Sequence, residues 1–347
     1  MTTRRLAILV ALALAVLGVA FWLSKPRTLP RDPDFGTPVL AGLAAHLDAV
    51  TGVRVVGAGE QTLVTLVRDG DHWLVRESSY RADATRVRRL LVTLGELHVV
   101  EAKTQDAARH AALGVEDPSD PKAGSLRLEL TGLSAPTALI VGHTAGTQGS
   151  YVRVPGTLQA YEARPQLDVG RTPRDWLARS ILDLAAARVA SIEVHRADGP
   201  AWRAERATRD AAHFAVPNLP KGKELTSLGA ADSSASAFGS LELDAVRAAP
   251  AAAAGEKRHT ATVTCYDGLV VTLTGSSGGD HWLGVHAAFD PAVAARYAAG
   301  AAKDAPAAAA VEREADRINA LVAGSEYQIP AYRFDGIFRP LSELLRH

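Results

Sequence analysis

An apolar stretch at residues 6–23 constrains this chain more than any other feature of its sequence. The stretch follows Arg4 and Arg5 and contains no charged residue. As an α-helix it would be roughly 27 Å long, close to the thickness of the hydrocarbon core of a bilayer. The residues after position 24 have a mixed, water-compatible composition. We therefore expect residues 1–24 to form a transmembrane anchor and the remainder to form the folded body.

Three interpretations of this stretch are open: a retained anchor, a cleaved secretory signal, and a buried core helix. A signal peptide has a shorter apolar core and small residues at its cleavage site, whereas this stretch ends in bulky side chains. Tryptophan also suits the membrane–water interface. The sequence favours the retained anchor, and we expect its membrane-embedded residues to include Leu6, Leu14, Leu17, Phe21, Trp22 and Leu23.

Basic residues flank the stretch on both sides, so their number does not decide its orientation. Arg4 and Arg5 precede it, and Lys25, Arg27 and Arg31 follow it. A very short basic tail usually stays in the cytoplasm. We therefore expect a single-pass protein of the bacterial inner membrane, with the bulk of the chain in the periplasm.

Composition narrows the function classes that the body can serve. The chain has 38 basic and 38 acidic residues, so its formal net charge is zero. A general nucleic-acid binder needs a basic surface, and the balance argues against one. The single cysteine, Cys265, excludes an internal disulfide. The eleven histidines are scattered without a metal-binding motif, and we expect no metal and no cofactor.

The body is expected to be α+β, with residues 25–50 forming a Pro-rich stalk and a short helix. Residues 51–184 and 185–347 then show a similar order of elements: an antiparallel strand meander, a capped helix, more strands and a closing helix. In the first half Asp83 is a good N-cap for a helix, and Asp232 has the corresponding place in the second. We also expect a helix over residues 173–184 and a strand over residues 329–334. The sequence thus predicts an internal duplication.

The most specific internal match is a Gly-Asp-His-Trp-Leu pentapeptide, at residues 70–74 and again at residues 279–283. It is compatible with a paired ligand site or with two hairpin exits. In the second case Gly and Asp form the turn and Trp begins a strand. The hairpin interpretation is favoured, because this composition is typical of turns.

Other candidate sites have weaker patterns. His281 and His286 are five residues apart, so on a strand they face opposite sides and cannot share a metal without a bulge. The Gly-rich segment at residues 142–149 is followed by a strand pattern, whereas a phosphate-binding loop needs a helix there. Cys265 lies within a strand pattern and is expected to be a buried apolar residue rather than a nucleophile.

Four arginines are concentrated near the first predicted helix: Arg81, Arg86, Arg88 and Arg89. They are the candidates for contact with a partner, either an acidic protein or lipid headgroups. A solvated helix face is the alternative.

Several short motifs together resemble the domain of unknown function 4340 family. They include the strand ending at residues 72–75, the segment Leu-Gly-Val-Glu-Asp-Pro at residues 113–118, and the hairpin at residues 140–152. Trp176-Leu177 and residues 327–332 resemble later parts of that family, although a tyrosine before Leu113 is missing. The resemblance implies one N-terminal membrane helix and an accessory role near ABC-type export systems, including those of gliding-motility type. It attaches no catalytic residue.

The expected function is therefore that of a non-enzymatic accessory or scaffold protein, held at the membrane beside an ABC-type permease or another envelope protein. A ligand-binding or sensing module that uses a groove between the two α+β units is the alternative, with the ligand unknown. A hydrolase would need a nucleophile–base pair that only folding brings together.

Overall fold

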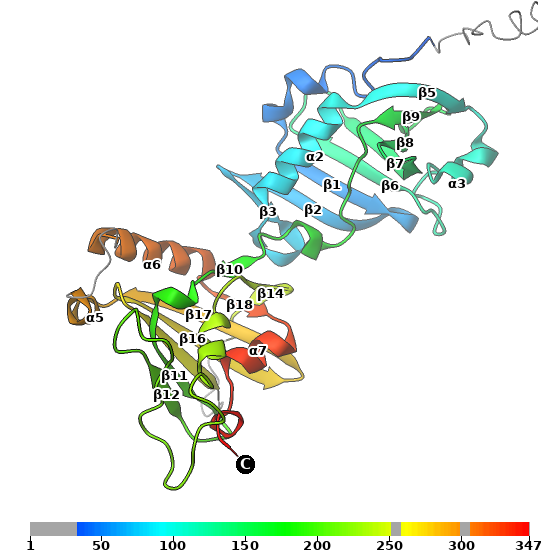
Figure 1. The fold of residues 1–347 in the computed structure, drawn as a ribbon. Coiled ribbons are helices and arrows are strands. Elements are labelled where there is room, and N and C mark those ends of the chain that lie inside the picture. The colour runs from blue at the N-terminus through cyan, green and yellow to red at the C-terminus, as the bar shows by residue number, and fades with distance from the viewer. Residues whose placement is uncertain (1–32, 251–257, 299–305, 347) are drawn as a thin grey trace, which may run out of the picture. The chain divides into compact units, whose positions relative to one another are not determined.

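The computed structural model describes residues 33–250, 258–298 and 306–346 (Figure 1). The predicted anchor at residues 6–23 lies outside these residues, and so does most of the predicted stalk. Within the described residues, no helix is both long enough and apolar enough to span a bilayer. The architecture is α+β, as expected, with mostly antiparallel sheets and few helices.

Packing divides the chain into two compact units. Unit 1 consists of the residues up to Thr62 together with 89–169, and unit 2 consists of 63–88 together with 170–347. Each unit is described below by itself. Most of a nine-stranded sheet lies in unit 1, although its strands between residues 63 and 81 are assigned to unit 2, and a seven-stranded sheet lies in unit 2.

A nine-stranded sheet has the order β4-β3-β2-β1-β6-β7-β8-β9-β5. Strand β6 alternates buried residues with half-buried or exposed ones, which is the pattern of a strand with one face on a core. The strand bounds are β1 Gly52–Gly57, β2 Gln61–Asp69, β3 His72–Val75, β4 Tyr80–Arg81, β5 His98–Thr104, β6 Leu126–Thr131, β7 Thr137–Ala145, β8 Gly149–Arg153 and β9 Ala160–Arg164.

Helix α2 (Ala84–Glu96) lies along one face of this sheet (Figure 1). The Oδ1 atom of Asp83 accepts hydrogen bonds from the backbone N–H groups of Thr85 and Arg86, at 2.9 and 3.1 Å. The predicted N-cap is thereby confirmed. The buried face of the helix is apolar and consists of residues spaced three and four apart: Val87, Leu90, Leu91 and Leu94. A short helix, α3 (His110–Leu113), ends at Gly114.

The first described residues are attached to the edge of the sheet. The Gly36 N–H donates to the Val99 carbonyl at 2.8 Å, and the Val39 N–H donates to the Leu97 carbonyl at 2.9 Å. Two 3₁₀ turns follow, Leu43–Ala45 and Leu47–Ala49, where the sequence predicted a short helix. This N-terminal segment (residues 34–50) therefore belongs to unit 1 and covers the free edge of β5.

Unit 2 is built on a seven-stranded sheet of order β12-β11-β15-β16-β17-β18-β14. A separate strand pair is formed by β10 and β13. The strand bounds are β10 Ser180–Leu182, β11 Val189–His195, β12 Trp202–Glu205, β13 Leu241–Glu242, β14 Ala245–Ala248, β15 His259–Cys265, β16 Leu269–Gly278, β17 Asp280–Phe289 and β18 Ser325–Gln328.

Among the described residues, four α-helices accompany this sheet: α4 Asp232–Ser236, α5 Pro291–Arg296, α6 Ala308–Val322 and α7 Ala331–Ile337. Helix α7 packs on β16 at Gly275, where an added Cβ would lie 2.4 Å from the Phe338 ring. Helix α6 lies beside β17, because the Asn319 amide accepts from the Ala287 N–H at 2.9 Å and donates to its carbonyl at 2.7 Å. Asn319 thus satisfies a strand edge as a neighbouring strand would.

Three predictions are wrong. Residues 173–184 form a 3₁₀ turn, Pro173–Trp176, and then the strand β10, instead of one helix. Residues 329–334 do not form a strand: Pro330 precedes helix α7. Asp232 is the first residue of α4 rather than its N-cap, and that helix ends at Ser236, before Phe238 and Leu241.

Candidate functional site

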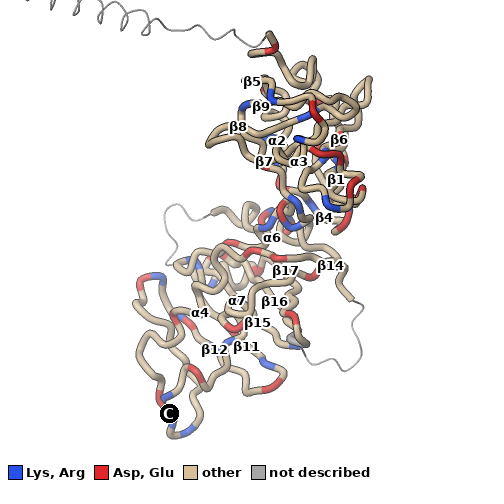
Figure 2. Tube along the Cα trace, turned by 90° about the vertical axis from the view of Figure 1, so that its right-hand side faces the viewer, with Lys and Arg blue, Asp and Glu red and all other residues tan. Residues whose placement is uncertain are grey.

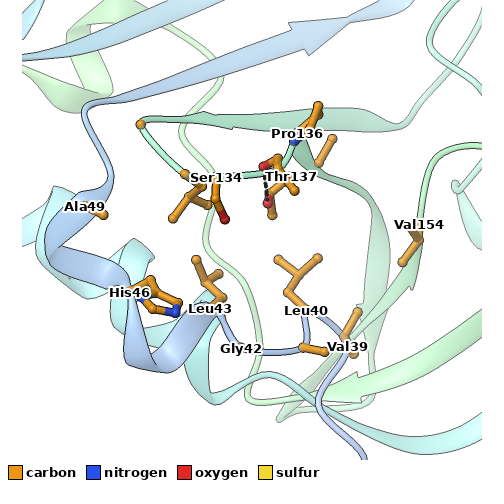
Figure 3. Close-up of a pocket in the computed structure, with 15 residues that line it drawn as sticks. Val39, Leu40, Gly42, Leu43, His46, Ala49, Ser134, Pro136, Thr137 and Val154 are labelled. Atoms are coloured by element: carbon orange, nitrogen blue, oxygen red, sulfur yellow. Dashed lines mark hydrogen bonds between the residues drawn. The ribbon is translucent and has the colours of Figure 1, made fainter.

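A pocket of about 800 Å³ opens in unit 1 between the N-terminal segment and the turn that joins β6 to β7 (Figure 3). Residues 39–43, His46 and Ala49 form one wall, and residues 132–138 form the other. Figure 3 shows the Leu40 and Leu43 side chains pointing into the cavity, opposite Ser134 and Thr137. Both leucines are buried, with 8% and 3% of their surface exposed, so this wall of the pocket belongs to the hydrophobic core.

Two glycines determine the shape of this pocket. Gly42 has a φ of +79°, which turns the chain between the two leucines. Gly132 has a φ of +95°, and a Cβ added there would lie 2.2 Å from the Ala49 carbonyl oxygen. The β6–β7 turn can therefore approach the N-terminal segment closely, and the Thr51 N–H bonds to the Thr131 carbonyl at 2.8 Å. The two walls are held together by backbone contacts.

The chemistry of the pocket is mainly apolar. Its polar side chains are His46, Ser134 and Thr137, and the Thr137 hydroxyl donates to the Ala135 carbonyl at 3.2 Å. The groove continues along the same turn toward Arg127 and Glu129. There Arg127 donates to Glu129 at 2.7 Å and to Glu60 at 2.8 Å, so the charged end is internally neutralised. An apolar cavity with a few polar groups suits binding of an apolar group.

A buried arginine, Arg153, links strand β8 to the chain around Val115. The Arg153 guanidinium, 5% exposed, donates to the carbonyl of Val115 at 2.8 Å and to that of Thr157 at 2.9 Å. Burial lowers the pKa of Arg153. Val115 lies inside the segment at residues 113–118, which is one of the short motifs that carry the family resemblance. Sequence reasoning missed Arg153, since nothing in its spacing distinguishes it from a surface arginine.

The same segment contacts the hairpin at residues 140–152. Gly142 lies against it so closely that an added Cβ would be 2.3 Å from the Leu113 carbonyl oxygen. Gly114 ends helix α3 with a φ of +67°. The short motifs at residues 113–118 and 140–152 therefore form one packed corner, and their role is structural.

A family model described as "Domain of unknown function (DUF4340)" matches residues 73–259, more than half of the chain. The chain belongs to the DUF4340 family. No curated protein and no solved structure gives a significant match. The matched range begins at Trp73 in β3 and ends at His259 in β15, and it includes the packed corner just described.

The four predicted partner-contact arginines of this DUF4340 protein fall into two places. Arg81 lies on β4 rather than on the helix, and Arg86, Arg88 and Arg89 lie on α2. Arg81 and Arg86 line a pocket of about 680 Å³ in unit 2, together with Trp73, Asp175 and Arg179. The Arg86 guanidinium lies 5.3 Å from the centre of the Trp176 ring. Arg88 and Arg89 are exposed.

Both pentapeptide copies are hairpin exits. Gly70 and Gly279 have φ values of +57° and +106°, in the turns that precede β3 and β17. The side chains after the turns differ in their surroundings, because His72 is exposed whereas His281 stacks on Phe334 at 4.7 Å. The Gly-rich segment at residues 142–149 likewise belongs to the β7–β8 hairpin.

The described residues contain no cluster of three or more His, Cys, Asp or Glu side chains that could hold a metal ion. Cys265 is buried in β15, and burial raises the pKa of its thiol to about 12. A thiol with such a pKa is a poor nucleophile at neutral pH.

The fold places His213 beside Asp232, an acid–base pair that the sequence did not indicate. The His213 Nδ1 atom lies 2.7 Å from Asp232 Oδ2, and Asp232 Oδ1 accepts from the Phe214 N–H at 2.9 Å. Within the described parts of the chain, no hydroxyl or thiol bonds to His213. The pair holds the loop before α4 in place, and it lacks the third member that a nucleophilic site requires.

We expect His259 to make the stability of unit 2 depend on pH. It is 5% exposed, its Nδ1 accepts from the Ala197 N–H at 3.3 Å, and burial, with nearby Arg196, lowers its pKa. In the unfolded chain the pKa of His259 is about 6.5, so below this pH its imidazole binds a proton in the unfolded state more readily than in the folded state. The free energy of unfolding therefore decreases as the pH falls below about 6.5. We expect a slope approaching 1.4 kcal/mol per pH unit, at most about that value.

Chemical denaturation between pH 7.5 and pH 5 would measure this slope. In His259→Asn, an amide oxygen can accept the same hydrogen bond without titrating, and the slope should decrease. An unchanged slope in this variant would assign the pH dependence to other groups.

Proposed function

We propose that this DUF4340 protein is a membrane-anchored, extracytoplasmic accessory protein that binds an envelope protein such as an ABC-type permease and catalyses no reaction. Residues 6–23 support the anchor, because they are apolar, uncharged and long enough to span a bilayer. Bulky residues at the end of the stretch favour its retention. Family membership is compatible with an accessory role and assigns no reaction.

The observation that carries the proposal is the position of the apolar pocket next to the tether. Its first wall begins at Val39, and the segment that forms this wall is bonded to β5. Nine residues lie between Ser24 and Asp34, and a chain of this length can span at most about 35 Å from one to the other. If the anchor is in the membrane, the pocket is confined to a layer close to the bilayer surface. A partner that is itself embedded in the membrane would present its extracytoplasmic loops in this layer.

Site-specific photo-crosslinking of the full chain in its native membranes tests this proposal. A photoreactive amino acid at Ala135, which is exposed at the pocket, should form a crosslink to a discrete membrane protein. The same probe at Leu158, an exposed apolar residue of unit 1 outside the pocket, is the matched control. Equal crosslinking from both positions, or none from Ala135, would contradict the proposal.

A pocket-blocking substitution gives a second test. In Ala138→Arg, a large charged side chain would replace a half-buried methyl group of the wall. We expect the Ala135 crosslink to fall at least about tenfold, which corresponds to about 1.4 kcal/mol of binding free energy. Circular dichroism should show an unchanged fold. A crosslink that persists in a folded Ala138→Arg protein would place the partner outside the pocket.

We also propose that the body arose by duplication, with residues 51–184 and 185–347 as the related halves. The supporting observations are the two pentapeptides at residues 70–74 and 279–283, each of which begins with a positive-φ glycine in a hairpin turn. Superposition of β2–β3 on β16–β17, extended outward along both sheets, is the test. If the neighbouring strands do not superpose, the proposed duplication is wrong.

A ligand-binding or sensing module is the second candidate function. The specific observation in its favour is the volume of the unit 1 pocket, about 800 Å³, because small-molecule sites are usually between about 300 and 1,000 Å³. Thermal-shift measurements with an apolar dye and a panel of fatty acids would test it. A rise in Tm with the wild type that is absent in Ala138→Arg would favour this candidate over a protein partner.

A further inference from the structure

A short segment of this chain carries a local excess of positive charge. Residues 76–89 contain five arginines against one glutamate and one aspartate, a formal balance of +3 in a chain whose total is zero. The segment runs from the end of β3 through β4 into the first half of α2 (Figure 2, blue beside β4). We name residues 76–89 the basic segment.

Four arginines of the basic segment have no ionic partner among the described residues: Arg76, Arg81, Arg88 and Arg89. Arginines elsewhere in the described chain are commonly paired. Arg188 binds Asp267 and Glu314 at 2.7 Å, and Arg247 binds Glu326 at 2.7 Å. The basic segment therefore presents guanidinium groups that the fold itself does not neutralise.

Helix stability does not explain these arginines. The N-terminal end of a helix carries a partial positive charge, so acidic side chains are favoured in its first turn and basic ones are not. Helix α2 has no acidic residue in its first turn and no basic residue in its last. Of its arginines, only Arg86 lies in the first turn, where the dipole opposes a positive charge, and Arg88 and Arg89 lie too far from the C-terminal end to be stabilised by the dipole.

The exposed side of α2 is suited to a macromolecular contact. Arg88 and Arg89 are exposed, and Val92, one turn further along, has 39% of its surface exposed. Residues at these spacings share one face of a helix. An exposed apolar residue beside planar, multidentate cations is a common composition at protein interfaces.

We propose that the basic segment is a docking surface for an acidic polypeptide segment, with Arg88 and Arg89 as its central contacts. Carboxylate side chains fit because a guanidinium can bind one in a bidentate manner. Charge complementarity identifies the occupant: the basic segment has a formal net charge of +3, and four of its arginines have no ionic partner among the described residues, so a partner of opposite sign fits it. The surface is distinct from the apolar pocket of unit 1, and this inference does not depend on the occupant of that pocket.

The test uses the full chain in nanodiscs of neutral phosphatidylcholine, with a fluorescent decaglutamate peptide as the probe. We expect binding that weakens as salt is raised, because exposed charge pairs are screened. Arg88→Gln with Arg89→Gln should weaken binding about tenfold, if each contact contributes a typical surface ion-pair energy. The Tm should not change, because neither side chain has a partner in the fold.

A matched control is available on α6, where Arg313 and Arg317 are also exposed and without an ionic partner, but have acidic residues as neighbours in the sequence. Arg313→Gln with Arg317→Gln should leave peptide binding within twofold of the wild type. An equal loss in both double variants would show that binding follows total charge, and would overturn the proposal.

Anionic lipid is the competing occupant, and a probe on Val92→Cys separates it from a polypeptide. The native Cys265 is buried, so the new thiol can be labelled selectively. Under the proposal, the emission of the label changes on addition of decaglutamate and is the same in phosphatidylglycerol and phosphatidylcholine nanodiscs. If it responds to phosphatidylglycerol and not to the peptide, the surface contacts lipid and the proposal is wrong. Failure of this proposal would leave the crosslinking result at Ala135 unaffected.

Discussion

Replacing Gly142 by alanine is expected to destabilise unit 1 by about 3 kcal/mol, the upper part of the usual range for overpacking. An added Cβ would lie 2.3 Å from the carbonyl oxygen of Leu113 and 2.7 Å from that of Gly114. Both atoms belong to the backbone of the packed corner, so no side-chain rotation can relieve the contact. Thermal unfolding of the full chain in detergent, followed by circular dichroism, should show a lower Tm for the transition of unit 1.

Gly199→Ala is the matched control for this prediction. Gly199 lies in the β11–β12 turn, and no atom is within 4 Å of a Cβ added there. Its substitution should change stability by less than about 0.5 kcal/mol, as is usual for exposed sites. Similar Tm values for the two variants would mean that the corner adapts to a methyl group, and that its close packing is not needed for the fold.

Replacing Trp176 by alanine is expected to cost about 3–5 kcal/mol, the range for deletion of a buried tryptophan. Trp176 is 0% exposed and is the largest fully buried side chain among the described residues. Its indole N–H donates to the Gly170 carbonyl at 3.1 Å, and its own carbonyl accepts from the Asp83 N–H at 2.7 Å. Loss of the ring would therefore remove apolar packing and leave the Gly170 carbonyl without its donor.

Two further variants separate these contributions. Trp176→Phe keeps most of the apolar volume and loses the indole donor, so it should lose less stability than Trp176→Ala. Trp73→Ala, at a half-buried tryptophan, should also cost less. Denaturant titration would rank the three variants. If Trp176→Ala is no worse than Trp73→Ala, the buried ring is not a major source of stability.

Local patterns predicted the elements that depend on local chemistry. The turn at residues 68–71 predicted the β2–β3 hairpin, because Asp-Gly between apolar strands favours a tight turn. Asp83 predicted the start of α2, because its carboxylate can accept from the first free N–H groups of a helix. In both cases a few neighbouring residues contain all the information that the element requires.

The wrong predictions arose where distant partners compete with local periodicity. Residues 173–184 have helical spacing, but the Ala178 N–H bonds to the Arg81 carbonyl at 2.9 Å and β10 pairs with β13. Asp232 has the features of an N-cap, but its carboxylate binds His213 and Phe214. For α7 a local signal was present and missed: Phe334, Ile337 and Phe338 have helical spacing and follow Pro330.

The candidate sites were less predictable than the fold. The unit 1 pocket is formed by residues 39–49 and 132–138, whose proximity depends on the pairing of β1 with β6. No short motif records such a pairing. The arginines near the first helix were visible in the sequence, but only the structure distinguishes Arg86, which stacks on Trp176, from exposed Arg88 and Arg89.

The attachment of residues 34–50 to unit 1 has a mechanical consequence. If residues 6–23 are held in the bilayer, any pull between membrane and body enters the fold at this segment. Three main-chain hydrogen bonds then carry the load together: Gly36 and Thr37 bond to Val99 of β5, and Val39 bonds to Leu97, the residue before β5. The Tyr161 hydroxyl adds a bond to Asp34 at 3.1 Å. Release of these bonds would uncover the edge of β5 and remove one wall of the apolar pocket, so tension on the tether would change the binding surface before it unfolded either sheet.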